Sequence, residues 1–246
     1  MYLAGQDPSP IEKQENVRKK FRPLILESFL QVNEKTVKLL PYYESYMLDS
    51  GAFSYLNGTL SGKKQDFTKY IDRYIRYVVD YDVKLFMEFD VDKFIGYPKV
   101  LEIRNYINRE AGRDCIPVWH ITRGVKDFSA MCEQYDYVAI GGMCTQEFPS
   151  TKMHLIPNLI KEAHKYKAKI HGLGFTRLKL LPTHHFDSVD STSWISGNRF
   201  GHAYRFTGKT MEVVNKPPGK QIDYKKVAVH NFIEWVKFQK WAKTHL

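Results

Sequence analysis

The stretch Tyr46-Met47-Leu48-Asp49-Ser50-Gly51-Ala52-Phe53-Ser54 is an apolar run that ends in an aspartate and turns at once through small residues. In an α/β barrel, functional side chains stand at the carboxyl ends of short buried strands, because the strand fixes the residue while the following loop leaves it open to substrate. Phe186-Asp187-Ser188-Val189-Asp190-Ser191-Thr192 repeats this pattern near the other end of the chain. Two such strands predict a two-carboxylate site, although Asp also caps local backbone groups in turns.

Short apolar runs alternate with amphipathic stretches along the whole chain, which is typical of a parallel sheet built from β-α units. Eight β-α repeats in 246 residues match a (β/α)8 TIM barrel, predicted as one compact domain over 1–246 with a C-terminal helix over about 224–244. The short link after the seventh strand also allows an incomplete or distorted barrel. A doubly wound sheet competes, but no Gly-x-Gly-x-x-Gly turn follows the first run. The strand candidates are 2–4, 24–29, 46–49, 84–90, 116–121, 137–142, 169–174 and 186–192, and the intervening helix candidates are 10–21, 33–40, 65–81, 98–111, 125–135 and 152–167.

The composition is that of an ordinary globular chain, with 43% hydrophobic and 26% charged residues, enough to bury a full core. The apolar runs are far shorter than the roughly 18 residues of a membrane span, and the amino terminus lacks the layout of a signal peptide. The sequence therefore predicts a cytoplasmic protein without a membrane partner. Cys115, Cys132 and Cys144 are widely spaced, without a Cys-x-x-Cys or a Cys/His cluster, which predicts free thiols and no zinc.

The charge balance favours an anionic partner. The 37 Lys and Arg residues outnumber the 27 Asp and Glu residues, which gives a formal net charge of +10. Nucleic acid is the commonest partner for an excess of this kind. Many basic residues fall on helix-like stretches, where a solvated face is the default explanation. The loop-borne candidates for phosphate contacts are Arg123, Arg177, Arg199 and Arg205.

If the barrel is right, the residues at the carboxyl ends of the strands converge on one mouth. This set is crowded and rich in acids, which favours a ligand with many N–H donors or a developing cation. The Gly141-Gly142 pair would let a flat ligand approach the backbone. The mouth set comprises Glu27, Asp49, Glu88, Asp90, Asp92, His120, Arg123, Gly141, Gly142, His171 and Asp190.

Five segments resemble motifs of the tRNA-guanine transglycosylases, in the same order along the chain. Leu-Asp-Ser-Gly-Ala-Phe at 48–53 resembles their Asp-Ser-Gly-Gly-Phe, and Met-Glu-Phe-Asp at 87–90 resembles their Met-Ala-Phe-Asp. Tyr-Val-Ala-Ile-Gly-Gly-Met at 137–143 resembles their Tyr-Ala-Val-Gly-Gly-Leu. Gly-Leu-Gly at 172–174 and Phe-Asp-Ser-Val at 186–189 follow in the places of their Gly-Val-Gly and Phe-Asp-Cys-Val.

The short chain and its Ser-Val-Asp-Ser-Thr-Ser-Trp run at 188–194 are most similar to the compact phage-type members, which exchange guanine in DNA for a 7-deazaguanine base. The resemblance implies that a carboxylate attacks the anomeric carbon, guanine leaves, and a preQ0-type base attacks the covalent intermediate after losing a proton to a second carboxylate. The base is then a co-substrate, and no other cofactor is needed. The chain lacks the family's Cys-x-Cys-x-x-Cys…His zinc module, so DNA is the favoured partner and tRNA the alternative.

The resemblance also implies residue roles. Asp49 resembles the acid/base residue, and Asp90 resembles the base-recognition carboxylate together with Gly141 and Gly142. A guanine-like ring presents N1–H and an exocyclic amine side by side, a bidentate match for one carboxylate. The further substrate-binding candidates are Glu88, Asp92, His120, His171 and Gly172.

The nucleophile has two candidates. The Phe-Asp-x-Val alignment points to Asp187, whereas strand alternation turns Asp190 toward the barrel axis if Val189 faces the helices. We favour Asp190. Two other hypotheses stay open at this level, a zinc-free tRNA-guanine transglycosylase and a nucleic-acid-binding barrel without catalysis. The sequence also leaves open a homodimer and partner proteins that help to open a duplex.

Overall fold

The computed structural model describes residues 1–7, 9, 11–60, 67–143, 147–215, 219 and 223–245. Eight parallel strands form one sheet in the order β4-β3-β2-β1-β8-β7-β6-β5. This is the strand order of the predicted α/β barrel, which is therefore confirmed. The strands are β1 (Tyr2–Ala4), β2 (Leu24–Ser28), β3 (Ser45–Asp49), β4 (Leu85–Phe86), β5 (Val118–Trp119), β6 (Tyr137–Ile140), β7 (Lys169–Gly172) and β8 (Ser188–Ser191).

The two ends of the sheet meet between β4 and β5, where the pairing is thin. Met87 and Ile116 form a single parallel bridge just beyond β4. Two backbone hydrogen bonds flank it, from Glu88 N to Ile116 O at 3.0 Å and from Ile116 N to Phe86 O at 2.7 Å. The distortion that the sequence allowed thus lies at this seam, and not after the seventh strand.

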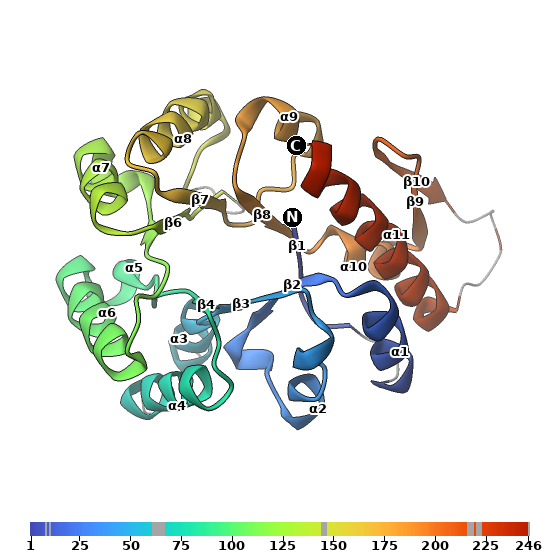
Figure 1. Cartoon of the computed structure of the whole chain (residues 1–246), viewed down its shortest axis with the longest axis horizontal. Helices are drawn as coiled ribbons and strands as arrows, with labels where there is room; N and C mark the ends of the chain where they lie inside the picture. The colour runs from blue at the N-terminus through green and yellow to red at the C-terminus, as the bar shows by residue number, and fades with distance from the viewer. Residues whose placement is uncertain are drawn as a thin grey trace.

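The helices surround the strands as a ring, with the amino terminus at the centre of the view (Figure 1). The longer ones are α1 (Ile11–Phe21), α4 (Phe67–Asp80), α6 (Tyr97–Ala111), α7 (Gly124–Gln134), α8 (Ile156–Lys165) and the C-terminal α11 (Tyr224–His245). The shorter ones are α2 (Glu34–Val37), α3 (Ala52–Leu60), α5 (Asp92–Ile95), α9 (Leu181–His184) and α10 (Ser193–Phe200). Short 3-10 turns lie at Phe29–Gln31, Leu40–Tyr42, Ile121–Arg123, Ser150–Leu155 and Leu178–Leu180.

Helix α4 illustrates how the sequence covers the sheet. Its buried residues Tyr70, Ile71, Tyr74, Ile75 and Val78 recur at helical spacing and form one apolar face. The Tyr74 hydroxyl donates to the Met87 carbonyl at 2.6 Å, which ties the helix to the chain beyond β4. Inside the barrel, a separate apolar cluster fills the space below the carboxyl ends of the strands, so the mouth has a solid floor. This cluster contains Tyr2, Ala4, Leu26, Met47, Met87, Ile116, Val118 and Ala139.

The structure adds a hairpin and the short helices α3, α5, α9 and α10, none of which the sequence interpretation proposed. Strands β9 (His202–Phe206) and β10 (Met211–Asn215) form an antiparallel hairpin after α10. The hairpin is fastened to α11, because Tyr204 N donates to Asn231 Oδ1 and Phe206 N donates to Glu234 Oε2, both at 2.8 Å. It therefore braces the C-terminal helix against the barrel wall.

The predicted free thiols are confirmed for Cys115 and Cys132, which are both buried. Cys144 lies outside the described residues, as do residues 10, 65 and 66 of two predicted helices. Within the described ranges, no helix combines the length and the apolar character needed to cross a membrane. In the same part of the chain, no group of three or more His, Cys, Asp and Glu side chains is arranged to hold a metal ion.

Candidate active site

A cavity of about 370 Å³ opens at the carboxyl ends of the strands. This volume falls within the roughly 300 to 1,000 Å³ typical of small-molecule sites. Five carboxylates line it, and three of them come from different strands of the barrel: Asp49 ends β3, Asp90 follows β4, and Asp190 lies in β8. Asp92, His120, Gly141 and Gly142 line it too. The structure thus brings together seven of the residues that the sequence proposed for the site.

Asp49 is held at the end of β3 by the small-residue turn that follows it. Its Oδ2 accepts a hydrogen bond from Gly51 N at 3.1 Å. Gly51 has φ +65°, and a Cβ there would lie 2.6 Å from Ser28 Oγ, so the turn requires glycine. Burial, together with the neighbouring charge of Asp190, raises the pKa of Asp49 to about 6. A carboxyl of this pKa can exchange a proton near neutral pH.

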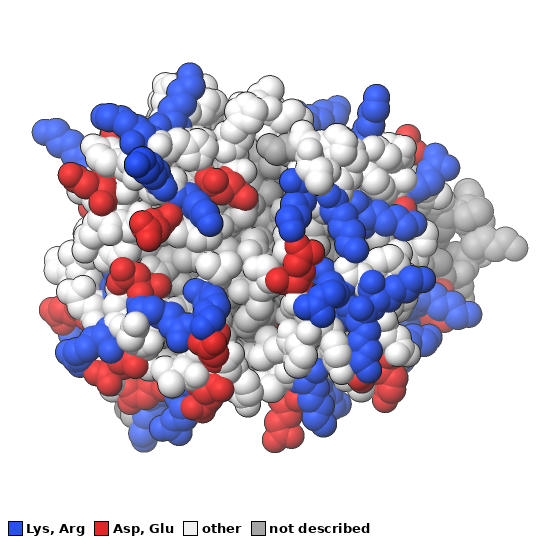
Figure 2. Space-filling model, in the orientation of Figure 1, with Lys and Arg blue, Asp and Glu red and all other residues white. Residues whose placement is uncertain are grey.

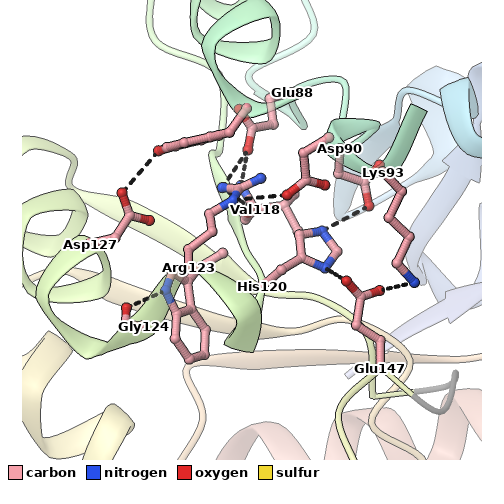
Figure 3. A network of polar contacts seen from close by, with 12 residues as sticks. Glu88, Asp90, Lys93, Val118, His120, Arg123, Gly124, Asp127 and Glu147 are labelled. Carbon is pink, nitrogen blue, oxygen red and sulfur yellow. Dashed lines mark hydrogen bonds and ion pairs between the residues drawn. The ribbon is translucent and has the colours of Figure 1, made fainter. Parts of the chain in front are cut away.

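Asp90 stands in a network of charged groups on one side of the cavity (Figure 3). Burial raises the pKa of Asp90 well above its ordinary value, and the charges of Asp49 and Glu88 raise it further. His120 Nε2 lies 3.8 Å from Asp90 Oδ2, and His120 Nδ1 lies 3.2 Å from Glu147 Oε1. Lys93 Nζ lies 2.8 Å from Glu147 Oε2. Burial lowers the pKa of His120, which favours the neutral ring.

The structure separates the two nucleophile candidates. Asp190 lines the mouth, where its Oδ1 accepts from Gly174 N at 2.6 Å and lies 3.3 Å from His171 Nε2. Asp187 instead lines a different cavity, together with Met1 and residues that begin the strands. Its Oδ2 accepts from Ile170 N at 2.9 Å and lies 2.9 Å from His164 Nε2. Only Asp190 is therefore placed to meet a ligand beside Asp49.

The two glycines after β6 have different structural reasons. A Cβ on Gly141 would lie 2.8 Å from both His120 Cε1 and Val118 Cγ1, so the missing side chain makes room for the neighbouring strand. Gly142 has φ +78°, a backbone conformation that other residues rarely adopt. Both glycines still present their backbone to the cavity, as the sequence interpretation required.

Besides Arg123, four residues predicted for the mouth or for substrate binding do not line the cavity. Glu88 is fully buried, with Oε2 accepting from Arg104 Nε and Oε1 from Val118 N, both at 2.6 Å, and it therefore fastens the barrel wall. Glu27 accepts from the Tyr46 hydroxyl at 3.1 Å and lines a separate recess beside α1. His171 has no exposed surface and lies behind Asp190. Gly172 packs against Phe186, because a Cβ added to this glycine would lie 3.0 Å from the Phe186 ring.

The proposed phosphate-binding arginines have different surroundings. The prediction for Arg123 is wrong, because its side chain is only 5% exposed and its Nε lies 3.1 Å from Asp92 Oδ2. Its guanidinium also lies 4.0 Å from the Tyr97 ring centroid. Arg123 is therefore held in the protein interior, where it orients the Asp92 carboxylate. Arg177 is exposed in the loop after β7. Arg205 is exposed on β9 and pairs with Glu212 on β10 at 2.6 Å. Arg199 falls in α10 and not in a loop, and its side chain lies outside the described part of the structure.

The structure adds cavity residues that the sequence interpretation did not propose. Phe53 lies in the first turn of α3, is 43% exposed and lines the cavity, with its ring centroid 5.5 Å from that of Phe94. An exposed aromatic beside a strand-end carboxylate is the signal that could have identified it. Lys93 and Glu147 also line the cavity, but they come from segments with no local pattern that would place them there.

Comparison with known proteins adds similarity at the level of structure only. No protein-family model matches the chain. No curated protein matches it. It is similar to an enolase protein from environmental shotgun sequencing of the Sargasso Sea, with a TM-score of 0.44 and 9% identity over 77% of this chain and 53% of that one. It is also similar to the carboxyl transferase domain of Rhizobium etli pyruvate carboxylase with 3-bromopyruvate, with a TM-score of 0.49 and 11% identity over 100% of this chain and 48% of that one. The chain spans about half the length of these two solved chains.

Proposed function

We propose that the chain is an enzyme, a base-exchange transglycosylase that replaces guanine in DNA with a preQ0-type 7-deazaguanine base. The observation that carries the proposal is the convergence of Asp49, Asp90 and Asp190 on one cavity at the carboxyl ends of the strands. The motif resemblance implies that Asp49 is the acid/base residue and that Asp90 recognises the base. For the nucleophile, the motif alignment points to Asp187, whereas strand alternation favours Asp190.

The chemistry needs two of these carboxylates. Asp190 attacks C1′ of the target nucleotide, the bond from C1′ to N9 breaks, and Asp49 in its protonated form gives its proton to the departing guanine. The incoming base then loses its N9 proton to Asp49 and attacks C1′, which releases Asp190 as a carboxylate. Each turnover returns both side chains to their starting state. The pKa of about 6 at Asp49 suits a group that must give and take a proton in alternate steps.

The remaining cavity groups fit a flat purine-like ring. An ionised Asp90 can accept from two adjacent N–H groups of a guanine edge. Phe53 offers an exposed aromatic face at the rim, and stacking on such a face is typical of base-binding sites. Gly141 and Gly142 expose backbone groups to the same space. The cavity therefore offers stacking and edge recognition together.

The net charge of +10 supports a nucleic-acid substrate. Figure 2 shows Lys and Arg dispersed among Asp and Glu over the face where the strands begin, opposite the cavity, with the densest group on the side that carries α1 and α11. A target base that reacts at C1′ in this cavity must leave the duplex stack, which costs a few kcal/mol. Phosphate contacts on the protein surface would offset that cost.

The test is mass spectrometry of nucleosides from DNA and from tRNA, each incubated with the protein and preQ0. The proposal expects the 7-deazaguanine nucleoside in the DNA digest, and expects Asp190→Asn to abolish it. The matched control is Asp187→Asn, which should retain exchange because that carboxylate lies outside the mouth. Incorporation into tRNA alone would replace DNA as the substrate. No incorporation into either nucleic acid by the folded wild type would contradict the proposal.

A further inference from the structure

A chain of hydrogen-bonded polar side chains runs through the barrel interior, from Tyr137 at the amino end of β6 to Asp190. The Tyr137 hydroxyl lies 2.6 Å from Ser188 Oγ, and Ser188 Oγ in turn contacts His171 Nδ1 within hydrogen-bond distance. His171 Nε2 lies 3.3 Å from Asp190 Oδ1. Ser188, His171 and Asp190 are all buried. Tyr137 and Ser188 fall within two of the motif segments, but the resemblance assigns a role to neither residue, and the exchange chemistry uses neither.

For a neutral imidazole, the chemistry of these groups favours one direction of the hydrogen bonds. Burial raises the pKa of the Tyr137 phenol, so it keeps its proton and can donate to Ser188 Oγ. The Ser188 hydroxyl is then free to donate to His171 Nδ1. A neutral imidazole that accepts at Nδ1 carries its proton on Nε2, and this N–H points at Asp190 Oδ1. The reverse order would set a nitrogen lone pair against a carboxylate.

We propose that His171 is a positioning residue for the nucleophile, held in its Nε2–H tautomer by Ser188 and Tyr137. Gly174 N and His171 Nε2 both lie within hydrogen-bond distance of Asp190 Oδ1. In the described part of the chain, no hydrogen bond reaches Asp190 Oδ2. Oδ2 is therefore the oxygen left to bond C1′. The Tyr2 ring meets the His171 ring edge-on, with centroids 6.1 Å apart, and limits its rotation.

The catalytic part of this inference rests on the proposed transglycosylase function, whereas the hydrogen-bond order does not. When the incoming base displaces Asp190 from C1′, negative charge returns to the carboxylate. Donors fixed at Oδ1 stabilise that charge without reorganising, which is how preorganised dipoles lower barriers. Losing the oriented N–H should therefore slow turnover more than it weakens binding of the base.

The first experiment measures the tautomer without any substrate. Nitrogen NMR of protein labelled with ¹⁵N-histidine distinguishes the protonated from the unprotonated ring nitrogen, and the His171→Gln spectrum assigns the His171 signals. The inference expects a neutral His171 with its proton on Nε2, and a shift toward a mixture of tautomers in Ser188→Ala. A proton on Nδ1 in the wild type, or an unchanged tautomer in Ser188→Ala, would overturn it.

The second experiment measures exchange kinetics in the same variants. Ser188→Ala should lower kcat about tenfold, the scale of one lost hydrogen bond, with KM for preQ0 unchanged. His171→Gln, whose amide can still donate toward Asp190, should keep more activity than His171→Leu. Ser129→Ala is the matched control, since it also removes a part-buried serine hydroxyl contact, here from α7 to Glu162 Oε1 on α8 at 2.8 Å, and should keep full activity.

Each outcome separates the two proposals. If Ser188→Ala and His171→Leu turn over like the wild type, His171 does not position the nucleophile. If the wild type exchanges no base while the NMR arm gives the expected tautomers, the hydrogen-bond order stands and the transglycosylase function falls. Should Ser188→Ala fail to fold, Tyr137→Phe removes the outer donor of the same chain and should shift the tautomer in the same direction.

Discussion

At the scale of single residues, the site is defined by acids that share one cavity and disturb one another. Asp190 contributes to the raised pKa of Asp49, and Asp49 contributes to that of Asp90. Like charges that cannot all ionise together are a common arrangement in sites that move protons. This arrangement has consequences for stability and for binding that can be measured separately.

Replacing Asp49 with Asn should stabilise the folded protein at alkaline pH. The folded pKa of about 6 lies above the ordinary 3.8, so the folded state binds the proton more tightly and ionisation opposes folding. This cost is nearly absent below about pH 4, grows as the pH rises to about 6, and is complete above it. Urea unfolding at pH 8 should show a gain of at most about 3 kcal/mol for Asp49→Asn, with a smaller gain at pH 4.5. An equal gain at both pH values would rule out the raised pKa as the cause.

Binding of preQ0 should release a proton from Asp90. In the free protein the raised pKa of Asp90 favours its protonated form, whereas a ring with two adjacent N–H donors favours the ionised form. The affinity should therefore increase as the pH rises. Calorimetry in two buffers of different ionisation enthalpy measures the released proton directly. Asp90→Ala should weaken binding by about 1.5 to 3 kcal/mol and remove the pH dependence. An unchanged affinity in this variant would exclude Asp90 from the pocket.

Which site residues the sequence could identify depended on whether their environment is local. Strand alternation was enough to turn Asp190 toward the axis, because the side-chain period of a strand is two. Glu88 and Arg123 were misassigned, because their surroundings are set by Arg104 and Asp92, which approach them only in the folded chain. A residue at the end of a strand is expected to lie near the mouth. Its position in the sequence does not show whether its side chain instead pairs with a buried partner.

At the scale of elements, the seam between β4 and β5 is held by side-chain hydrogen bonds and an ion pair, because its backbone pairing amounts to a single bridge. Glu88 bridges it, since its carboxylate accepts from Arg104 Nε on α6 and from Val118 N at the start of β5. Arg123 Nη1 also donates to the Val118 carbonyl at 2.8 Å. A buried carboxylate therefore substitutes here for the backbone pairing that the other strand pairs have.

Removing this fastening should destabilise the whole barrel. Glu88→Ala leaves Arg104 buried without its counter-ion, and breaking a buried pair in this way costs about 3 to 5 kcal/mol. Denaturant unfolding of the two proteins measures the loss. Glu102→Ala is the matched control on α6, the helix that carries Arg104. Its pair with Lys99 is exposed, so its loss should change stability by less than about 1 kcal/mol. A Glu88→Ala protein as stable as this control would contradict the role assigned to the seam.

The sequence predicted elements well where periodicity spans many residues, and poorly where polar groups interrupt it. Helices α4 and α6 begin and end within two residues of their expected bounds. The predicted fourth strand 84–90 shrinks to Leu85–Phe86, because beyond the Met87 bridge the chain leaves the ladder to place Glu88 and Asp90. The hairpin of β9 and β10 escaped notice because its outer residues are mostly exposed, so that its strands show no strong apolar alternation.

At the scale of the whole molecule, the excess of basic residues is the feature that most directly favours a polyanionic substrate. Affinity for DNA should fall steeply with salt, because each phosphate contact releases counterions. Arg177 is exposed beyond β7, so Arg177→Ala should reduce the slope of log K against log salt by about one. Arg205→Ala should leave that slope unchanged, since Glu212 already neutralises this arginine. Wild-type binding that is insensitive to salt would contradict a nucleic-acid substrate.

The most direct test of the account is to trap the covalent intermediate. The protein is incubated with guanine-containing DNA in the absence of preQ0, denatured, digested and mapped by mass spectrometry. The account expects a nucleotide attached to Asp190, lost in Asp190→Asn and retained in Asp187→Asn. An adduct on Asp187, or base exchange by Asp190→Asn at the wild-type rate, would contradict the assignment of Asp190 as the nucleophile.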